Sequence, residues 1–449
     1  MSRNPHHPAR RRARTALISA VALATAATMA ACGSSGGSSP AGSAAAGKVA
    51  LQFWGSANGL GKAVDAWNST HPDIQVDFTT DTTDAAGFAK LAAAAKAGNA
   101  PCVAQFDAQD LATFASQGLV QDVSQYASQY KGAYSTSAWQ AASPGGSTYG
   151  IPVESAPNFF AYQANLFKKY GLTVPATWSQ LIADGVKLHA QNPNLKIMNY
   201  APEDPSGFVG LNWEAGATWY KATSNGWIID FTSPQALEAA NVLQQLVSDH
   251  LLSNISYTDP GIWKTWDDGG TLAMTTSTWQ LPGYSGAFPN SDGNWAITTV
   301  PQYAVGDHST DSNFNIAGVL KGCADPQQAT EFANWLGSDS SALKVTTNGA
   351  TGYPGWFPAL NDVSNYVDDV VPTKMVPQAD SGQIVSAAAA EVNTDWEYGP
   401  DYATMYNQMA SYWPKVLSGG MTAVQLLQTM QAWTLNDLKS QGINATAGS

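Results

Sequence analysis

An aromatic residue and a polar residue stand at or just after the carboxyl end of each of two predicted strands. Trp54 and Asn58 follow the first of these strands, and Phe106 and Asp107 end the second. The rings could stack on a planar molecule or on the apolar face of a sugar ring, and the carboxylate of Asp107 could accept two hydroxyl hydrogen bonds. The alternatives are a core position beneath the loop for Trp54 and a helix cap for Asp107. The sixteen tryptophans and seventeen tyrosines of the chain allow both interpretations, because aromatic rings also fill cores.

These two strands belong to an alternation of strands and helices. Alternating apolar residues indicate strands at 49–54, 74–78 and 102–107. Helical periodicity and capping residues indicate helices at 60–68, 84–98 and 111–116. Such an alternation is typical of an α/β fold with a parallel sheet. Ligands of these sheets gather at the carboxyl ends of the strands, so the strand ends named above are the first candidates for a binding site.

The run from Tyr149 to Tyr162 indicates a connection between two bodies. A chain of 449 residues is too long for one simple core, and two lobes are the expected organisation. In this run a Gly-Ile-Pro turn leads into an extended segment, Pro157 interrupts it, and an apolar strand follows. Proline lacks a ladder donor and holds the preceding residue in extended geometry. We therefore interpret the run as a hinge strand with a cleft beside it.

The first 31 residues have the composition of a secretory signal, because four arginines between positions 10 and 14 precede an apolar stretch of small residues. Cys32 directly follows the predicted cut site, as in a bacterial lipobox, where that cysteine receives lipid. Residues 32–47 would then form a flexible tether. We expect an exported lipoprotein on the outer face of the bacterial cell membrane. The alternative is an ordinary signal with an incidental cysteine.

The charge balance argues against nucleic acid as a partner. Removal of the predicted signal takes away five arginines and no acid, which changes the formal net charge from −13 to −18. A domain this acidic, with scattered basic residues, lacks the basic patch that binds a phosphate backbone.

Two cysteines remain after the predicted signal, Cys102 and Cys323. Export permits disulfides, and an even number of cysteines favours pairing. We therefore predict a disulfide between them. The alternative is two buried free thiols.

Several segments occur in a fixed order along the mature chain. They are Gly98-Asn-Ala-Pro101, Tyr149-Gly-Ile-Pro152 with Pro175-Ala-Thr-Trp178, Gly270-Thr-Leu-Ala-Met274 with Trp279, and Phe332-Ala-Asn-Trp335-Leu336. In this order they resemble segments of the extracellular solute-binding proteins of carbohydrate ABC transporters, the family that includes maltose-binding protein. Cys102 stands where that family usually has aspartate. No single motif is specific, but their order covers nearly all of the mature chain.

The resemblance implies an α/β, two-lobed periplasmic-binding-protein-like fold of type II, with a mainly parallel, helix-flanked sheet in each lobe and hinge crossings between them. Residues 48–154 and 302–352 would form lobe 1, and residues 155–301 and 353–449 would form lobe 2. A mono- or oligosaccharide would bind between the lobes, and closure would present it to the permease subunits of an ABC import system. We expect a monomer without a cofactor.

The resemblance also implies which residues reach the ligand. Glu154 would face the cleft from the hinge, and Trp279 and Trp396 match stacking positions of the family. Trp356 lies near a predicted crossing, and Asp204 stands in a polar loop that could reach into the cleft. The alternatives are a structural hinge contact for Glu154 and a solvated loop acid for Asp204.

An enzyme is the main alternative class, because a secreted glycosidase also needs aromatic rings and paired carboxylates. No pair of acids is set by spacing, and the sequence contains no nucleophile elbow, zinc motif or P-loop. Its six histidines form no metal cluster. We therefore expect a binding protein without catalytic residues or a metal. A protein of the same fold that binds a polyamine or another small polar solute is the second alternative.

Overall fold

The computed structural model describes residues 48–57, 59–304, 306–347, 355–367 and 370–448. The predicted signal, Cys32, the predicted tether and Asn58 therefore lie outside the described residues. Across the described ranges, no helix combines the length and the apolar composition needed to cross a bilayer.

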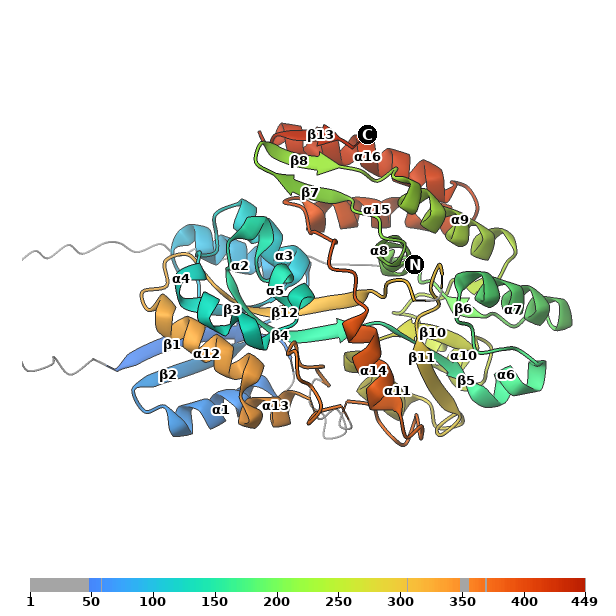
Figure 1. Ribbon diagram of the computed structural model, residues 1–449, viewed down its shortest axis with the longest axis horizontal. Coiled ribbons are helices and arrows are strands. Elements are labelled where there is room, and N and C mark those ends of the chain that lie inside the picture. Colours follow the sequence, from blue (N-terminus) through green and yellow to red (C-terminus); the bar gives the residue numbers. More distant parts are fainter. Residues whose placement is uncertain (1–47, 58, 305, 348–354, 368–369, 449) are drawn as a thin grey trace, which may run out of the picture. The chain divides into compact units, whose positions relative to one another are not determined.

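Five strands form the first sheet in the order β2-β1-β3-β12-β4 (Figure 1). They are β1 (Val49–Gly55), β2 (Ile74–Thr80), β3 (Val103–Asp107), β4 (Gly150–Pro157) and β12 (Asp311–Val319). β1 runs parallel to β2 and β3, whereas β12 runs antiparallel to β3 and β4. The sequence predicts the parallel strands β1, β2 and β3, because strands and helices alternate in this part of the chain. Parallel neighbours need such helical crossover connections.

Helices cover both faces of this sheet. They are α1 (Leu60–Thr70), α2 (Ala85–Ala97), α3 (Ala108–Ser116), α12 (Pro326–Ser338) and α13 (Ser340–Thr346). On one face Phe53 of β1 packs against Phe332 of α12, with ring centroids 5.5 Å apart. On the other face Phe106 of β3 packs between Phe88 of α2 and Phe114 of α3. Successive strand residues point to opposite faces, so each strand contributes to both layers of the core.

The second sheet is antiparallel and has three strands in the order β10-β5-β11. They are β5 (Phe159–Gln163), β10 (Ala273–Thr276) and β11 (Trp295–Thr299). A separate two-stranded sheet consists of β6 (Met198–Asn199) and β9 (Leu252–Ser253). β10 and β11 pair antiparallel with β5, while β6 pairs parallel with β9. The Ala273 N–H of β10 donates to the Ile197 carbonyl over 3.0 Å, which links β6 to β10. The strand directions therefore differ from the mainly parallel sheet predicted for each lobe, because the first sheet is mixed and the second is antiparallel.

Within the described residues, two crossings lead directly from a strand of the first sheet to a strand of the second or back. β4 continues into β5 through Asn158, whose N–H donates to the Thr310 carbonyl over 2.9 Å. β12 begins at Asp311, opposite Pro157. The predicted break at Pro157 is confirmed, and the lobe boundaries built on these crossings stay a prediction.

The remaining helices pack around these sheets. The short ones are α4 (Ser124–Ala127), α5 (Thr136–Ala141), η1 (Ser128–Ala133), η2 (Pro144–Gly146) and η3 (Thr278–Gln280). The others are α6 (Ala164–Tyr170), α7 (Trp178–Gln191), α8 (Ser206–Glu214), α9 (Pro234–Ser248), α10 (Gly261–Asp267), α11 (Leu281–Ala287), α14 (Ser381–Ala390), α15 (Tyr402–Leu417) and α16 (Ala423–Ser440). A hairpin of β7 (Tyr220–Thr223) and β8 (Gly226–Ile229) is extended by β13 (Ala445–Ala447).

Helix caps form at two Thr-x-x-Gln patterns of the sequence. Thr422 and Gln425 form the complete, reciprocal capping box at the start of α16. Thr177 accepts from the Gln180 N–H at the start of α7, but the Gln180 side chain accepts from the Ala176 N–H instead of completing the box. Local sequence thus determines where these helices begin.

Cys102 and Cys323 form a disulfide, as predicted. It joins the residue before β3 to the turn after β12, where the Leu320 N–H also donates to the Cys102 carbonyl over 3.0 Å. The two cysteines are 221 positions apart in the sequence. In the chain-entropy account, such a link removes conformational freedom from the unfolded chain and thereby stabilises the folded state.

Replacement of Cys102 and Cys323 by serine should lower the free energy of unfolding by roughly 2–5 kcal/mol, the usual range for loss of a native disulfide. Urea titration followed by tryptophan fluorescence measures this change. Excess thiol should destabilise the natural protein to the same extent and leave the double variant unchanged. An unaltered denaturation midpoint in the double variant would contradict the prediction.

Candidate functional site

A cavity of about 660 Å³ lies where the carboxyl ends of β3, β6 and β10 meet the start of β12. We call it the strand-end cavity. Asp107 lines it from β3, Asn199 from β6, Thr275 from β10 and Asn313 from β12. Its volume lies within the range of small-molecule sites. Its position is the one expected for ligands of an α/β sheet.

Asp107 does not cap the helix that follows it. It occupies the position before α3, but its side chain accepts no hydrogen bond from the first turn of that helix. Its Oδ1 accepts instead from Asn313 Nδ2 over 2.6 Å. Burial raises the pKa of Asp107 to about 6, although the bond from Asn313 partly offsets this effect. Asp107 thus presents a carboxyl group to the cavity, and its contact with a ligand stays a prediction.

Two further carboxyl groups come from the second sheet's side of the cavity. Asp204 accepts from the Ser206 N–H over 2.9 Å and from the Tyr406 hydroxyl. Glu214 of α8 is buried and accepts from the Trp178 indole N–H over 3.0 Å. Burial holds the pKa of Glu214 well above its usual range. Asp204 therefore lies at the cavity, as the resemblance suggested, whereas Glu214 is an acid that the sequence did not single out.

Asp311 at the start of β12 completes the set of acids. Its carboxyl group accepts from the Ser155 hydroxyl over 2.7 Å, from the Ala156 N–H over 3.0 Å and from the Asn313 N–H over 2.9 Å. Burial nevertheless raises the pKa of Asp311 to about 7. These acids do not amount to a metal site, since no group of three or more His, Cys, Asp or Glu residues in the described part of the chain could hold a metal ion.

Two aromatic rings beside the cavity are only half covered. Trp279 is 48% exposed and Tyr257 is 41% exposed, and both line the cavity. Among the described residues, Val174 and Val186 are the other large apolar side chains that remain strongly exposed. The Trp279 indole N–H donates to Ser312 Oγ over 3.4 Å, which orients the ring. Rings left uncovered beside a cavity are available to stack on a ligand.

Glu154 lies in β4 behind the cavity and does not line it. Its side chain is only 1% exposed, and Asn315 Nδ2 donates to its Oε2. Gln105 Nε2 donates to Asn315 Oδ1 over 2.8 Å, and the Ser56 N–H donates to Gln105 Oε1 over 3.0 Å. Burial raises the pKa of Glu154 well above its usual range. This placement corrects the prediction of a cleft-facing Glu154 and supports its alternative, a structural contact in the hinge.

Phe106 is a core residue rather than a ligand contact. It is fully buried, and its ring packs against Phe88 and Phe114. Neighbouring residues of a strand point to opposite faces of the sheet. Phe106 and Asp107 therefore cannot both reach the same cavity, and the structure selects Asp107.

Trp54 and Trp356 also lie apart from the strand-end cavity. Trp54 lines a shallow hollow beside α2, where Lys90 Nζ lies 4.7 Å from the centroid of its ring. Trp356 is buried in the core. The prediction that these two rings face the same cleft as Asp107 is corrected by their placement.

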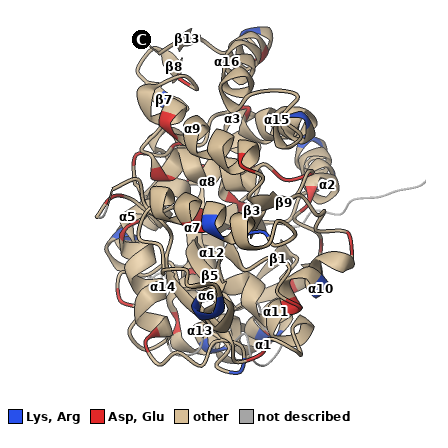
Figure 2. Cartoon of the chain, turned by 90° about the vertical axis from the view of Figure 1, so that its right-hand side faces the viewer, with Lys and Arg blue, Asp and Glu red and all other residues tan. Residues whose placement is uncertain are grey.

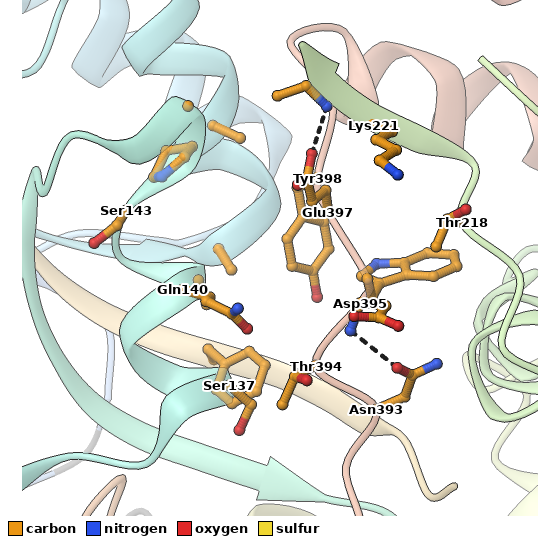
Figure 3. Close-up of a pocket in the computed structure, with 18 of the residues that line it drawn as sticks. Ser137, Gln140, Ser143, Thr218, Lys221, Asn393, Thr394, Asp395, Glu397 and Tyr398 are labelled. Carbon is orange, nitrogen blue, oxygen red and sulfur yellow. Dashed lines mark hydrogen bonds between the residues drawn. The ribbon is translucent and has the colours of Figure 1, made fainter. Parts of the chain in front are cut away.

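A second cavity, of about 590 Å³, lies between α5 and the β7–β8 hairpin (Figure 3). We call it the hairpin cavity. In Figure 3, Ser137 and Gln140 stand on one side, and Lys221 stands on the other, near the hairpin. Trp213 and Tyr398 line both cavities and so form a wall between them.

Trp396 lies in the hairpin cavity, not in the strand-end cavity. It is 6% exposed and stacks on Trp213, with ring centroids 5.1 Å apart and planes 8° from parallel. The two tryptophans predicted as stacking positions, Trp279 and Trp396, therefore line different cavities. The prediction for Trp396 is corrected, because Trp213 already occupies one face of its ring.

The polar residues at the start of β12, above all Asp311 and Asn313, were not predicted from the sequence. The rule for parallel sheets points only to the carboxyl ends of strands. Because β12 runs antiparallel to β3, its amino-terminal part lies beside the carboxyl end of β3, and Asn315 pairs with Asp107. The available signal was the polar run 309–313 before an apolar strand.

The buried carboxyl groups should make the protein less stable as the pH rises from about 4 to about 8. Burial raises the pKa of Asp311 to about 7, and burial with the nearby charge of Asp107 raises the pKa of Asp110 to about 8. Such groups bind protons more tightly in the folded state. Their stabilising contribution is therefore complete below the unfolded pKa and is lost as the pH rises through the folded pKa. The melting temperature should fall across this range.

The variant Asp311→Asn should show a shallower fall in melting temperature with pH. Asp395→Asn, which removes an exposed carboxylate from the hairpin cavity, is the matched control and should keep the slope of the natural protein. A melting temperature that rises between these pH values in the natural protein would refute the prediction.

Comparison with known proteins identifies relatives in sequence. A family model described as bacterial extracellular solute-binding protein matches residues 36–342. A lactose-binding protein from Rhizobium radiobacter is 23% identical over 217 residues, which cover 46% of this chain and 50% of that protein. The sn-glycerol-3-phosphate-binding periplasmic protein of Escherichia coli (strain K12) is 26% identical over 259 residues, 51% of this chain and 56% of that protein. The chain thus spans about half the length of these curated relatives.

Solved structures share the fold. The galacto-N-biose/lacto-N-biose I-binding protein of an ABC transporter from Bifidobacterium longum has a TM-score of 0.77 and 23% identity, and the match covers 89% of this chain and 99% of that one. The sugar-binding protein MalE from Xanthomonas citri has a TM-score of 0.73 and 14% identity, over 88% of this chain and 98% of that one. This likeness confirms the predicted α/β fold of type II. Because the family model matches well over half of its residues, the chain belongs to the bacterial extracellular solute-binding proteins.

Proposed function

We propose that this protein captures a carbohydrate in the strand-end cavity and delivers it to the permease subunits of an ABC import system. The observation that carries the proposal is the presence of the half-exposed rings of Trp279 and Tyr257 in one cavity with carboxyl and amide groups. A sugar needs both, since its apolar faces stack on rings and its hydroxyls bond to planar polar groups. Relatives named for lactose and lacto-N-biose support this choice.

The cavity draws its polar groups from both sheets. Asp107 and Asn313 come from the first sheet, whereas Asn199 and the loop residue Asp204 lie on the side of the second. A ligand that bonds to both groups would hold the two bodies together. Closure on the ligand would then be favoured, because the ligand makes contacts in the closed arrangement that it cannot make in the open one.

The hinge would include the two described crossings and a third junction, where the proposed lobes meet at residues 352 and 353, outside the described residues. The proposed lobes are residues 48–154 with 302–352, and residues 155–301 with 353–449. The permease would respond to the closed, loaded protein. The protein would act as a monomer. It would bind its solute without a catalytic step or a cofactor, in keeping with relatives that are named as binding proteins.

We also propose that the protein is anchored outside the cell membrane through a lipid on Cys32. Residues 1–31 would be removed as the signal, and residues 32–47 would tether the binding domain. The family is described as extracellular, which supports export. The lipid on Cys32 is proposed from the sequence of the signal region alone. Roughly 0.8 kcal/mol per buried methylene would hold the acyl chains in the bilayer.

An anionic solute fits the cavity poorly, although one relative is named for sn-glycerol-3-phosphate. Asp107, Asp204, Glu214 and Asp311 line the cavity, and no described lysine, arginine or histidine does. Phosphate groups are usually bound by arginine, lysine or the N-termini of helices. A polyamine is the second candidate solute, because its binding would need acids and aromatic rings together.

Binding of a saccharide should raise the melting temperature of the protein. A ligand that binds only the folded state adds about 2.7 kcal/mol of stability at a hundred times its Kd. Thermal-shift measurements over mono- and disaccharides, sn-glycerol-3-phosphate and spermidine test this, with calorimetry on every hit. Saccharide binding without any released product is expected. Stabilisation by no saccharide, or turnover of one, would remove the proposed function.

Trp279→Ala should weaken binding of the saccharide identified in this way about ten-fold, because the variant loses a stacking surface. Trp279→Phe should retain most of the affinity. Trp396→Ala is the matched control: it should destabilise the protein by about 3–5 kcal/mol, as loss of a buried tryptophan does, and affect affinity much less. An equal loss of affinity in both alanine variants would contradict the assignment of the two rings to different cavities.

A further inference from the structure

We propose that the carbohydrate bound in the strand-end cavity is positively charged, as an amino sugar is through its ammonium group. The inference rests on the proposed function and adds the chemical class of the ligand to it. The cavity, its position at the strand ends and its uncovered rings define the site without its acids. The acidic side chains determine whether the cavity favours a positively or a negatively charged ligand.

The negative charge of the cavity is not balanced by the protein. Four carboxyl groups line it, at Asp107, Asp204, Glu214 and Asp311, and no described basic side chain does. The ion pairs between described residues lie elsewhere, at Asp81, Asp268 and Asp292. Only 12% of all residues are charged, and Figure 2 shows the sparse distribution of charged residues on one side of the molecule. Four acids around one cavity are therefore a local concentration of carboxyl groups. Burial keeps some of them protonated, because it raises the pKa of Glu214 well above its usual range and the pKa of Asp311 to about 7.

Two of these carboxylates have an oxygen that is free to bind. The Oδ1 atoms of Asp107 and Asp204 accept the bonds from Asn313, Ser206 and Tyr406 described above. Within the described part of the chain, the Oδ2 atom of each has no hydrogen-bond donor in reach. Glu214 and Asp311 are more deeply buried. Glu214 accepts one bond, from Trp178 at Oε2, whereas Asp311 accepts bonds at both of its oxygens. A ligand ammonium group has three N–H donors and could bond to such free oxygens.

The electrostatic environment favours a cation over a neutral group at this position. Burial raises the pKa values of Asp107 and Asp311 because no opposite charge stabilises their ionised forms. An ammonium group beside Asp107 would supply that charge. The faces of Trp279 and Tyr257 add a second attraction, since aromatic faces attract cations. Aromatic faces would also attract the ammonium groups of a polyamine, so spermidine is one of the probes in the test below.

Calorimetry with matched pairs of sugars tests the proposal. The probes are mono- and disaccharides of gluco, galacto and manno configuration, each compared with its 2-amino-2-deoxy counterpart near pH 6.5, with spermidine as a further probe. We expect an amino sugar to bind most tightly, about ten-fold tighter than its neutral partner. Added salt should lower the affinity for the amino sugar and leave the affinity for its neutral partner unchanged.

The possible outcomes separate this inference from the proposed function. A neutral sugar that binds as tightly as its amino counterpart would overturn the charge assignment and leave the proposed function intact. Binding of spermidine alone, or of none of the probes, would overturn both. An affinity for the amino sugar that does not change with salt would also overturn the charge assignment. This measurement requires no variant protein.

Two isosteric variants locate the charge. Asp107→Asn and Asp204→Asn keep an oxygen that accepts the existing bonds, but each removes a negative charge. Each should reduce the preference for the amino sugar over its neutral partner about ten-fold. Asp395→Asn removes a charge from the hairpin cavity, beyond the wall of Trp213 and Tyr398, and should leave the preference unchanged. An unchanged preference in both cavity variants would contradict the proposal.

Discussion

The antiparallel pairing of β12 with β3 is the constraint on which the site depends. It places Asn315 opposite Asp107, so that Asn313 comes close enough to donate to the Asp107 carboxylate. A parallel β12 would bring its apolar carboxyl-terminal end to this place instead. A slip of one residue would turn every side chain of the strand to the other face of the sheet. The Cys102–Cys323 disulfide holds the far end of the same strand pair and so helps to maintain the register.

The acids around the crossings show how binding and stability oppose one another. Buried carboxyl groups are costly unless donors surround them. Asp311 has three donors, whereas Asp107 and Asp204 keep part of their hydrogen-bonding capacity free. The protein could gain stability by pairing these groups with a lysine or an arginine, but the site would then lose its ability to bind through them. Polar groups left free beside a cavity are the expected cost of a binding site.

The wall of Trp213 and Tyr398 links the two cavities mechanically. Trp396 packs against Trp213 from the hairpin cavity, while Trp213 itself lines the strand-end cavity. Because packed aromatic rings resist deformation, a change in the position of this wall alters both spaces together. Trp396 thus supports one face of Trp213 from the hairpin cavity and does not itself line the strand-end cavity.

The sequence by itself determined the local features of this protein: the parallel strands β1, β2 and β3, the caps at Thr177 and Thr422, the break at Pro157 and the cysteine pair. Each depends on residues close in the chain or, for the cysteines, on a simple count. The rule that ligands gather at strand ends predicted Asp107, and the resemblance to a known family predicted Trp279; both line the strand-end cavity. Tertiary structure decided the rest. It decided which face of β3 meets the cavity, the antiparallel direction of β12 and the separation of Trp396 from Trp279. All three depend on contacts between segments far apart in the chain. Local sequence does not specify the register of such segments or the faces that they turn to one another.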